Sequence, residues 1–139
     1  MVLVDGAGVP LGMLLAPANL AESHLAEATL EEVAVRRSGP GRPRKKPDRI
    51  IADRAYDSRN LWERMKRKGI DFIAPHLRNR KNRYQDGRKL RRYRRRWIVE
   101  RTFAWLFNFR RLVSRFDRKI ENFRAFLHLA CALITLRRF

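Results

Sequence analysis

The chain opens with two short apolar runs, Val2–Val4 and Leu11–Leu15, on either side of the sequence DGAGVP. Asp-Gly followed by Gly and Pro is typical of a tight turn, so the two runs predict a β-hairpin. Residues 20–35 then place scattered apolar side chains among glutamates and alanines. Both residue types favour helices, and this stretch predicts one.

A strand, a helix and a second strand are predicted over residues 49–77. The strands are the apolar runs RIIAD and IDFIA, and the helix lies between them at about 59–68. Asp57 and Ser58 are both suited to cap the start of this helix, and capping is the preferred interpretation of Asp57. Because a helix connects the strands, we expect a parallel pair with a crossover, the βαβ unit.

Two helices are predicted in the C-terminal third, over about 90–115 and 120–137. Side chains three or four positions apart share one face of the first: Tyr93, Arg96, Glu100, Phe103 and Phe107. The same spacing recurs in the second helix: Ile120, Phe123, Leu127, Cys131 and Ile134. The three tryptophans, Trp62, Trp97 and Trp105, are interpreted as core residues of their helices.

The 139 residues suit a single α/β domain over 1–139, with a small mixed sheet built from the hairpin and the two βαβ strands. The expected segments are the hairpin and first helix (1–35), a basic Gly/Pro loop (36–48), the βαβ unit (49–77), a basic segment (78–92) and the two long C-terminal helices (93–139).

Positive charge is abundant and unevenly distributed. The net charge is +19, yet residues 1–35 contain five acids and no Lys or Arg, so the other 104 residues carry +24. Segment 78–96 alone holds eleven basic residues and one acid. Such a run is a solvated face, a disordered arm or a track for phosphates. Because so large a charge repels itself in a folded chain, we expect an anionic partner, with nucleic acid the first candidate.

The remaining composition narrows the protein class. The single cysteine, Cys131, excludes a disulfide framework and a cysteine-based zinc site. The histidines lack metal-ligand spacing. The apolar start lacks a basic region typical of signal peptides, and no uncharged apolar run reaches the roughly eighteen residues of a membrane span. We therefore expect a cytoplasmic protein without a membrane partner.

Two carboxylates, Asp53 and Glu100, lie at positions typical of ligand-binding or catalytic residues. Asp53 ends an apolar strand, where open α/β sheets bind ligands, and Glu100 lies on a face with aromatic neighbours. Structural interpretations remain open for both: Asp53 as a turn or capping residue, and Glu100 as an ion-pair partner of Arg96 or Arg101. Phosphodiester cleavage supplies a functional reason for both acids, because two divalent ions about 4 Å apart need oxygen ligands.

The strings ADRAYDS (52–58) and YRRRWIVERTFAWLFNFRRL (93–112) resemble the DDE transposases of bacterial insertion sequences. That family's last acid follows the pattern Tyr, two residues, Arg, three residues, Glu, then six residues and a Lys or Arg. Tyr93, Arg96 and Glu100 match in type and spacing. The final basic position falls on Phe107, which departs from the pattern, and either Arg110 or Arg111 substitutes one turn later. The sequence VLVDGAGVPLG also resembles the family's central hairpin, so the resemblance covers essentially the whole chain.

The resemblance implies a partial RNase H-like fold, with Asp53 as the second acid of the triad and Glu100 as the third. It implies that these two acids are catalytic and bind metal, with two Mg²⁺ or Mn²⁺ ions in the complete site. It also implies DNA partners, both the element ends and the target, for a nucleoid-associated bacterial enzyme that cleaves and joins strands. The expected DNA-binding residues are Tyr93, Arg96, Arg91, Arg92, Arg94, Arg95, Arg110 and Arg111.

In that family the first acid lies upstream of the hairpin, whereas Asp5 lies on the predicted hairpin turn. We therefore expect the chain to begin after the first acid and to be inactive alone. It is then either the second half of a frameshifted transposase or the remnant of a decayed element. The expected partner is an N-terminal transposase half or a second copy, because an uncovered sheet edge favours pairing.

Two other functions remain open. A non-catalytic basic nucleic-acid-binding protein explains the charge equally well and assigns Asp53 and Glu100 structural roles. A ribosome-associated protein predicts preference for RNA and ranks last, because charge neutralisation does not require a βαβ unit and a carboxylate-bearing aromatic helix.

Overall fold

The hairpin expected at the start of the chain is confirmed. The computed structural model describes residues 1–139 except 18, 37–38 and 139, so part of the predicted 36–48 loop lies outside the described residues. Strands β1 (Val2–Val4) and β2 (Pro10–Met13) pair antiparallel. The carboxylate of Asp5 accepts hydrogen bonds from the backbone N–H groups of Ala7 and Val9, each at 2.8 Å. Asp5 is therefore a turn-forming residue.

The βαβ unit is confirmed too. Strands β3 (Arg49–Ile51) and β4 (Asp71–Ile73) are parallel, and α2 (Arg59–Arg67) connects them after a short 3₁₀ turn, η1 (Arg54–Tyr56). Ser58 caps α2 through a bond from the N–H of Leu61 at 3.4 Å. The preferred prediction that Asp57 is the cap was wrong, and the reason lies in its buried contacts described below.

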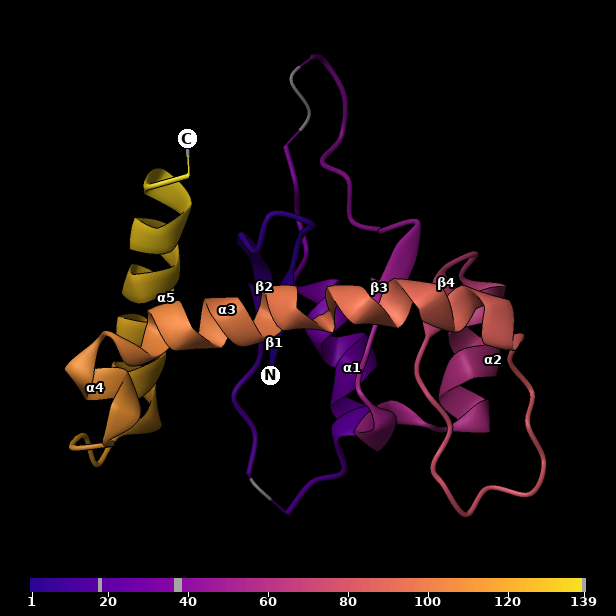
Figure 1. The fold of residues 1–139 in the computed structure, drawn as a ribbon. Helices are drawn as coiled ribbons and strands as arrows, with labels where there is room; N and C mark the ends of the chain where they lie inside the picture. The colour runs from indigo at the N-terminus through magenta and orange to yellow at the C-terminus, as the bar shows by residue number, and fades with distance from the viewer. Residues whose placement is uncertain (18, 37–38, 139) are drawn as a thin grey trace.

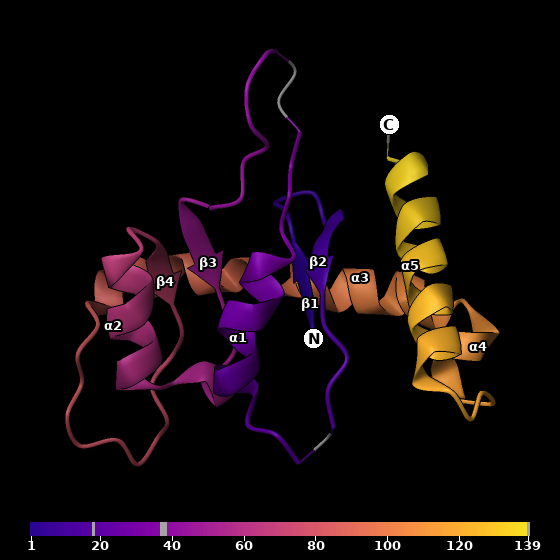
Figure 2. The same cartoon turned by 180° about the vertical axis from the view of Figure 1, so that it is seen from behind.

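The fold class is confirmed as α/β, with a difference in the sheet. Among the described residues the hairpin and the β3–β4 pair form two separate two-stranded sheets instead of one mixed sheet. Helix α1 (Glu22–Glu31) lies between the hairpin and the βαβ unit, as Figures 1 and 2 show. Its contacts on both sides join the sheets through a hydrophobic core instead of through hydrogen-bonded strands.

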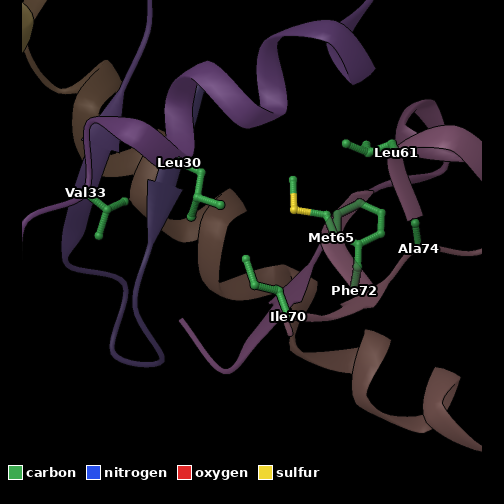
Figure 3. Close-up of a cluster of buried hydrophobic side chains, with 7 residues drawn as sticks. All are labelled: Leu30, Val33, Leu61, Met65, Ile70, Phe72 and Ala74. Carbon is green, nitrogen blue, oxygen red and sulfur yellow. The ribbon is translucent and has the colours of Figure 1, made fainter. Parts of the chain in front are cut away.

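That core gathers side chains from α1, α2 and β4 and the residues beside them. Figure 3 shows its buried members: Leu30, Val33, Leu61, Met65, Ile70, Phe72 and Ala74. Leu61 and Met65 have no exposed surface. Burying a side chain of this size contributes about 1.5–3 kcal/mol, so this cluster fixes where β3 ends relative to α1 and α2.

The single helix predicted over 90–115 was wrong. The chain instead forms a 3₁₀ helix, η2 (Gly87–Arg96), followed by α3 (Trp97–Phe107) and the short α4 (Arg110–Val113). Figures 1 and 2 show η2 and α3 running end to end across both sheets. The break after α3 falls at Phe109, whose backbone is extended and whose side chain packs against a second core cluster.

The last helix, α5 (Ile120–Leu136), is confirmed close to its predicted bounds. Its buried residues are Leu127, Ala130, Cys131 and Ile134, which form the second cluster with Leu106 of α3. The interpretation of Trp97 as a core residue was wrong, since 52% of its surface is exposed, whereas Trp62 and Trp105 are partly buried and pack against the two clusters. No helix in the described ranges is long and apolar enough to cross a membrane.

Candidate active site

Asp53 lies where the chain leaves β3. The N–H of Ala52 still bonds to the carbonyl of Ile73 on the neighbouring strand, after which the chain turns into η1. Asp53 starts that turn with an extended backbone, and its Oδ1 accepts the N–H of Arg54 at 2.7 Å. The turn directs a carboxylate with 50% exposure away from the β3–β4 pair and toward η2.

Tyr93 and Arg96 approach this carboxylate from η2. The Tyr93 hydroxyl donates to Asp53 Oδ1 at 2.8 Å, and Arg96 Nη1 lies 3.5 Å from each carboxylate oxygen. In a 3₁₀ helix, side chains three apart are eclipsed, so the three-residue period explains why both reach the same acid. The Arg96 guanidinium lies 5.5 Å from the centre of the Tyr93 ring.

These contacts favour the charged form of Asp53. Hydrogen bonds from the Arg54 N–H and the Tyr93 hydroxyl, followed by the charge of Arg96, lower the pKa of Asp53 below its usual 3.8. Burial and the hydrogen bond to Asp53 raise the pKa of Tyr93, so its hydroxyl remains a donor at neutral pH. Asp53 is therefore an ionised, partly exposed carboxylate, the state that a divalent cation requires of its ligands.

Glu100 lies in the first turn of α3, one helical turn after Arg96. Its Oε1 lies 2.8 Å from Arg96 Nη2, and 55% of its side chain is exposed. A single guanidinium thus lies between Asp53 and Glu100, which are far apart in sequence. Both structural interpretations are also realised, because Asp53 does cap η1 and Glu100 does pair with Arg96.

The hairpin fixes the rotation of α3. Thr102, which is fully buried, donates its hydroxyl to the carbonyl of Gly8 at 2.8 Å, and Arg101 Nη2 donates to the carbonyl of Ala7 at 2.7 Å. Gly8 adopts φ +86°, which lets the turn approach α3 this closely. Glu100 lies two residues before Thr102, on the opposite side of α3, so with Thr102 held against the hairpin Glu100 points away from the hairpin and pairs with Arg96 of η2.

The donor set suits a hard cation but is small. Carboxylate oxygens are preferred ligands of Mg²⁺ and Mn²⁺, which keep several waters when the protein supplies few ligands. Over the parts of the chain that the structure describes, no group of three His, Cys, Asp or Glu side chains is placed to hold a metal ion. Asp53 and Glu100 therefore have the oxygen donors that such an ion prefers, but the two side chains alone do not make up a complete set of ligands.

The predicted DNA-binding arginines fall into two groups. Arg91, Arg92, Arg94 and Arg95 lie on η2 and are exposed, beside the row that carries Tyr93 and Arg96. Arg110 and Arg111 lie on α4, which Figure 1 shows at the end of α3 away from η2. Arg111 instead lies 3.7 Å from Asp117 and stacks over the ring of Phe126.

A second acidic centre, around Asp57, was missed by sequence reasoning. The side chain of Asp57 has no exposed surface and receives bonds from Tyr84 Oη at 2.5 Å, Arg80 Nε at 2.6 Å and the Leu77 N–H at 2.7 Å. The Nδ1 of His76 lies 3.0 Å away. Because these partners lie 19–27 residues away in sequence, no local sequence pattern predicts the contacts.

The Asp57 cluster holds the segment that leads into η2. Burial alone raises the pKa of Asp57, but bonds from Tyr84, Leu77, His76 and Arg80 outweigh it and lower the pKa to about 2. The backbone N–H groups of Tyr84 and Gln85 also point at His76 Nε2, at 3.3 and 3.4 Å. This places the proton on His76 Nδ1, facing Asp57, and anchors residues 76–85 as a structured loop.

Comparison with known proteins shows the family of the chain. Residues 1–135 match the family described as the Transposase DDE domain. The chain belongs to the DDE transposase family. It is also 36% identical over 140 residues to the protein described as a transposase for insertion sequence element IS402 of Burkholderia cepacia. The aligned region covers 99% of this chain and 63% of that relative. No solved structure matches the chain.

Proposed function

We propose that this DDE transposase chain supplies two of the metal-binding acids of a site that cleaves and joins DNA at insertion-sequence ends. The observation that supports the proposal is the convergence of Asp53 and Glu100 on the guanidinium of Arg96. The two acids come from separate elements, the end of β3 and the start of α3. The hydrophobic core positions the first element and the hairpin positions the second. A purely structural pair does not require acids from two elements to meet at an exposed site.

Each residue has a role that follows from its contacts. Asp53 and Glu100 would hold Mg²⁺ or Mn²⁺, and the Tyr93 hydroxyl keeps Asp53 Oδ1 oriented. Bound metal would supply charge neutralisation and activation of the attacking oxygen in phosphodiester chemistry. The exposed arginines of η2, Arg91, Arg92, Arg94 and Arg95, would bind DNA phosphates, which fix the position of a duplex without reading its sequence.

The isolated chain is proposed to be inactive. Two carboxylates bind a hard cation weakly, and the chain spans 63% of its relative's length, so a complete site is proposed to include an acid from an N-terminal half or a second copy. Asp5 does not provide that acid, because its Oδ1 is engaged by two backbone N–H groups of the hairpin turn.

The proposal is tested by Glu100→Gln. The chain is complemented with the part of the IS402 relative that it does not cover, and cleavage of a labelled element end is measured with Mg²⁺ or Mn²⁺. We expect cleavage to fall to background, because Gln is a neutral and weaker ligand. Glu63→Gln is the matched control, since Glu63 pairs with Arg59 one turn away at 2.9 Å on an exposed helix face, as Glu100 does with Arg96.

A non-catalytic nucleic-acid-binding function is the second candidate, favoured by the net charge of +19. It predicts that Glu100→Gln and Asp53→Asn leave DNA affinity unchanged and that Mn²⁺ does not bind either acid. Binding of Mn²⁺, followed by the loss of its free electron paramagnetic resonance signal, separates the two candidates in the isolated chain. Equal binding by the wild type and both variants would refute the metal site.

A further inference from the structure

Arg96 lies where a cation of the proposed metal site would be needed. Its Nη1 contacts both oxygens of Asp53 and its Nη2 contacts Glu100. On Asp53, Oδ1 also accepts bonds from the Arg54 N–H and the Tyr93 hydroxyl, whereas Oδ2 contacts Arg96 alone among the described residues. Moving Arg96 away is therefore enough to make Oδ2 of Asp53 available to a metal ion.

We propose that Arg96 is a displaceable counter-ion: its guanidinium neutralises Asp53 and Glu100 in the metal-free protein and moves to a DNA phosphate when a divalent cation enters. This inference rests on the proposed function and adds a role for Arg96 that goes beyond phosphate contact. A guanidinium and a divalent cation are both positive and require the same carboxylate oxygens. They therefore compete directly for this site.

The contacts of Arg96 suit such an exchange. The side chains of Arg96, Asp53 and Glu100 are 40%, 50% and 55% exposed, and the contacts to Asp53 are long, at 3.5 Å. Ion pairs between groups this exposed are weak because water screens them. Among the described residues, Arg96 contacts Asp53, Glu100 and the ring of Tyr93, none of which is buried, so turning the guanidinium toward solvent breaks no buried hydrogen bond.

The exchange couples metal binding to DNA binding. When a DNA phosphate binds Arg96, Asp53 Oδ2 and Glu100 become available to a metal ion. When a metal ion binds those acids, Arg96 becomes available to a phosphate. Coupling of this kind is reciprocal, so DNA strengthens metal binding by the same factor as metal strengthens DNA binding. A transposase built this way binds its metal ions mainly when DNA is present.

The test measures Mn²⁺ affinity of the full chain by electron paramagnetic resonance for the wild type, Arg96→Gln and Arg95→Gln. Arg95 is the matched control, because it is the exposed neighbour on η2 and contacts neither acid among the described residues. We expect Arg96→Gln to bind Mn²⁺ about fivefold more tightly than Arg95→Gln, the factor expected for loss of one competing half-exposed ion pair. The gain should vanish when Asp53→Asn is added.

A second measurement follows the coupling. The affinity for a short fluorescent DNA duplex is determined by anisotropy with and without Mn²⁺. Arg95→Gln should bind DNA more weakly than the wild type under both conditions, because it removes a proposed phosphate contact. We expect Mn²⁺ to strengthen DNA binding by a similar factor in the wild type and in Arg95→Gln, and by a much smaller factor in Arg96→Gln.

The outcomes separate the inference from the proposed function. If Mn²⁺ binding depends on Asp53 and Glu100 but Arg96→Gln binds no more tightly than Arg95→Gln, the counter-ion role is overturned and the metal site stands. If Mn²⁺ binding is insensitive to Asp53→Asn and Glu100→Gln, the metal site is refuted and the counter-ion role with it. Tighter binding by Arg96→Gln that requires Asp53 supports both.

Discussion

Replacing Asp57 with asparagine tests whether the buried cluster holds the loop that leads into η2. The Asp57 carboxylate receives bonds from Tyr84, Arg80 and the N–H of Leu77 and contacts His76, and the Asp57 side chain itself has no exposed surface. An asparagine side chain keeps one acceptor oxygen and replaces the other with an NH₂ donor. It therefore leaves buried donors unpaired and removes the charge that balances Arg80.

The size of the effect follows from the pKa and from the burial. Lowering the pKa of Asp57 from 3.8 to about 2 corresponds to about 2 kcal/mol at 1.36 kcal/mol per unit. Breaking a fully buried ion pair costs about 3–5 kcal/mol, and because Arg80 keeps 27% of its side chain exposed, the cost here lies below that range. We expect Asp57→Asn to lower the free energy of unfolding by about 2–3 kcal/mol.

Urea denaturation of the full chain at pH 7 measures this loss, with Asp48→Asn as the control because Asp48 is an 85% exposed partner of Arg44. Trypsin cleavage at the basic residues 78–83 should accelerate in Asp57→Asn under native conditions, since the loop loses its anchor. Because the folded pKa is depressed, the contribution of Asp57 is fully present above about pH 4 and disappears as the pH falls toward 2. The difference between wild type and variant should shrink over that window.

An unfolding free energy within about 0.5 kcal/mol of the wild type, with unchanged cleavage at 78–83, would refute the reasoning, because surface substitutions have effects of that size. Tyr84→Phe provides an independent check. It removes one donor to Asp57 and keeps the ring beside Trp62 and His76, so its loss should be smaller than that of Asp57→Asn.

Two further predictions concern the hairpin and the second core cluster. Gly8→Ala should lower the free energy of unfolding, measured with urea, by about 1–3 kcal/mol, because φ is +86° and a Cβ would lie 3.0 Å from Thr102 Oγ1. Gly6→Ala is the control and should stay near wild type, because a Cβ at Gly6 would have nothing within 4 Å. Burial raises the pKa of Cys131 to about 11, so the thiol should not react with a disulfide reagent at pH 8 until the chain unfolds. Fast modification of native protein would contradict this placement of α5.

Local patterns were sufficient for much of the fold. Turn residues between apolar runs predicted the β1–β2 hairpin, and the run–helix–run pattern predicted the parallel β3–β4 pair. The spacing of Tyr93, Arg96 and Glu100 predicted that they act together, and the contacts of Arg96 with Asp53 and Glu100 place all four residues in one cluster. These features depend on neighbours in sequence or on a short repeat, which the sequence displays directly.

Other features depend on contacts between distant segments. The backbone of 87–96 is a 3₁₀ helix that places Tyr93 and Arg96 against Asp53, and the extended Phe109 ends the predicted long helix by packing into the second core cluster. Trp97 is exposed because the hairpin contacts another side of α3 through Thr102. Helical periodicity does not distinguish these outcomes, since it records only which side chains share a face.

The sequence by itself therefore determined the order and type of most elements, the basic character of 78–96 and the choice of Asp53 and Glu100 as candidate site residues. Only the tertiary structure decided that Asp57 is a buried anchor instead of a helix cap, and that Arg96 lies between Asp53 and Glu100. The physical reason is the same in both cases. A carboxylate is stabilised by whichever donors the folded chain brings to it, and the side-chain donors to Asp57 and Asp53 lie 19 to 43 residues away.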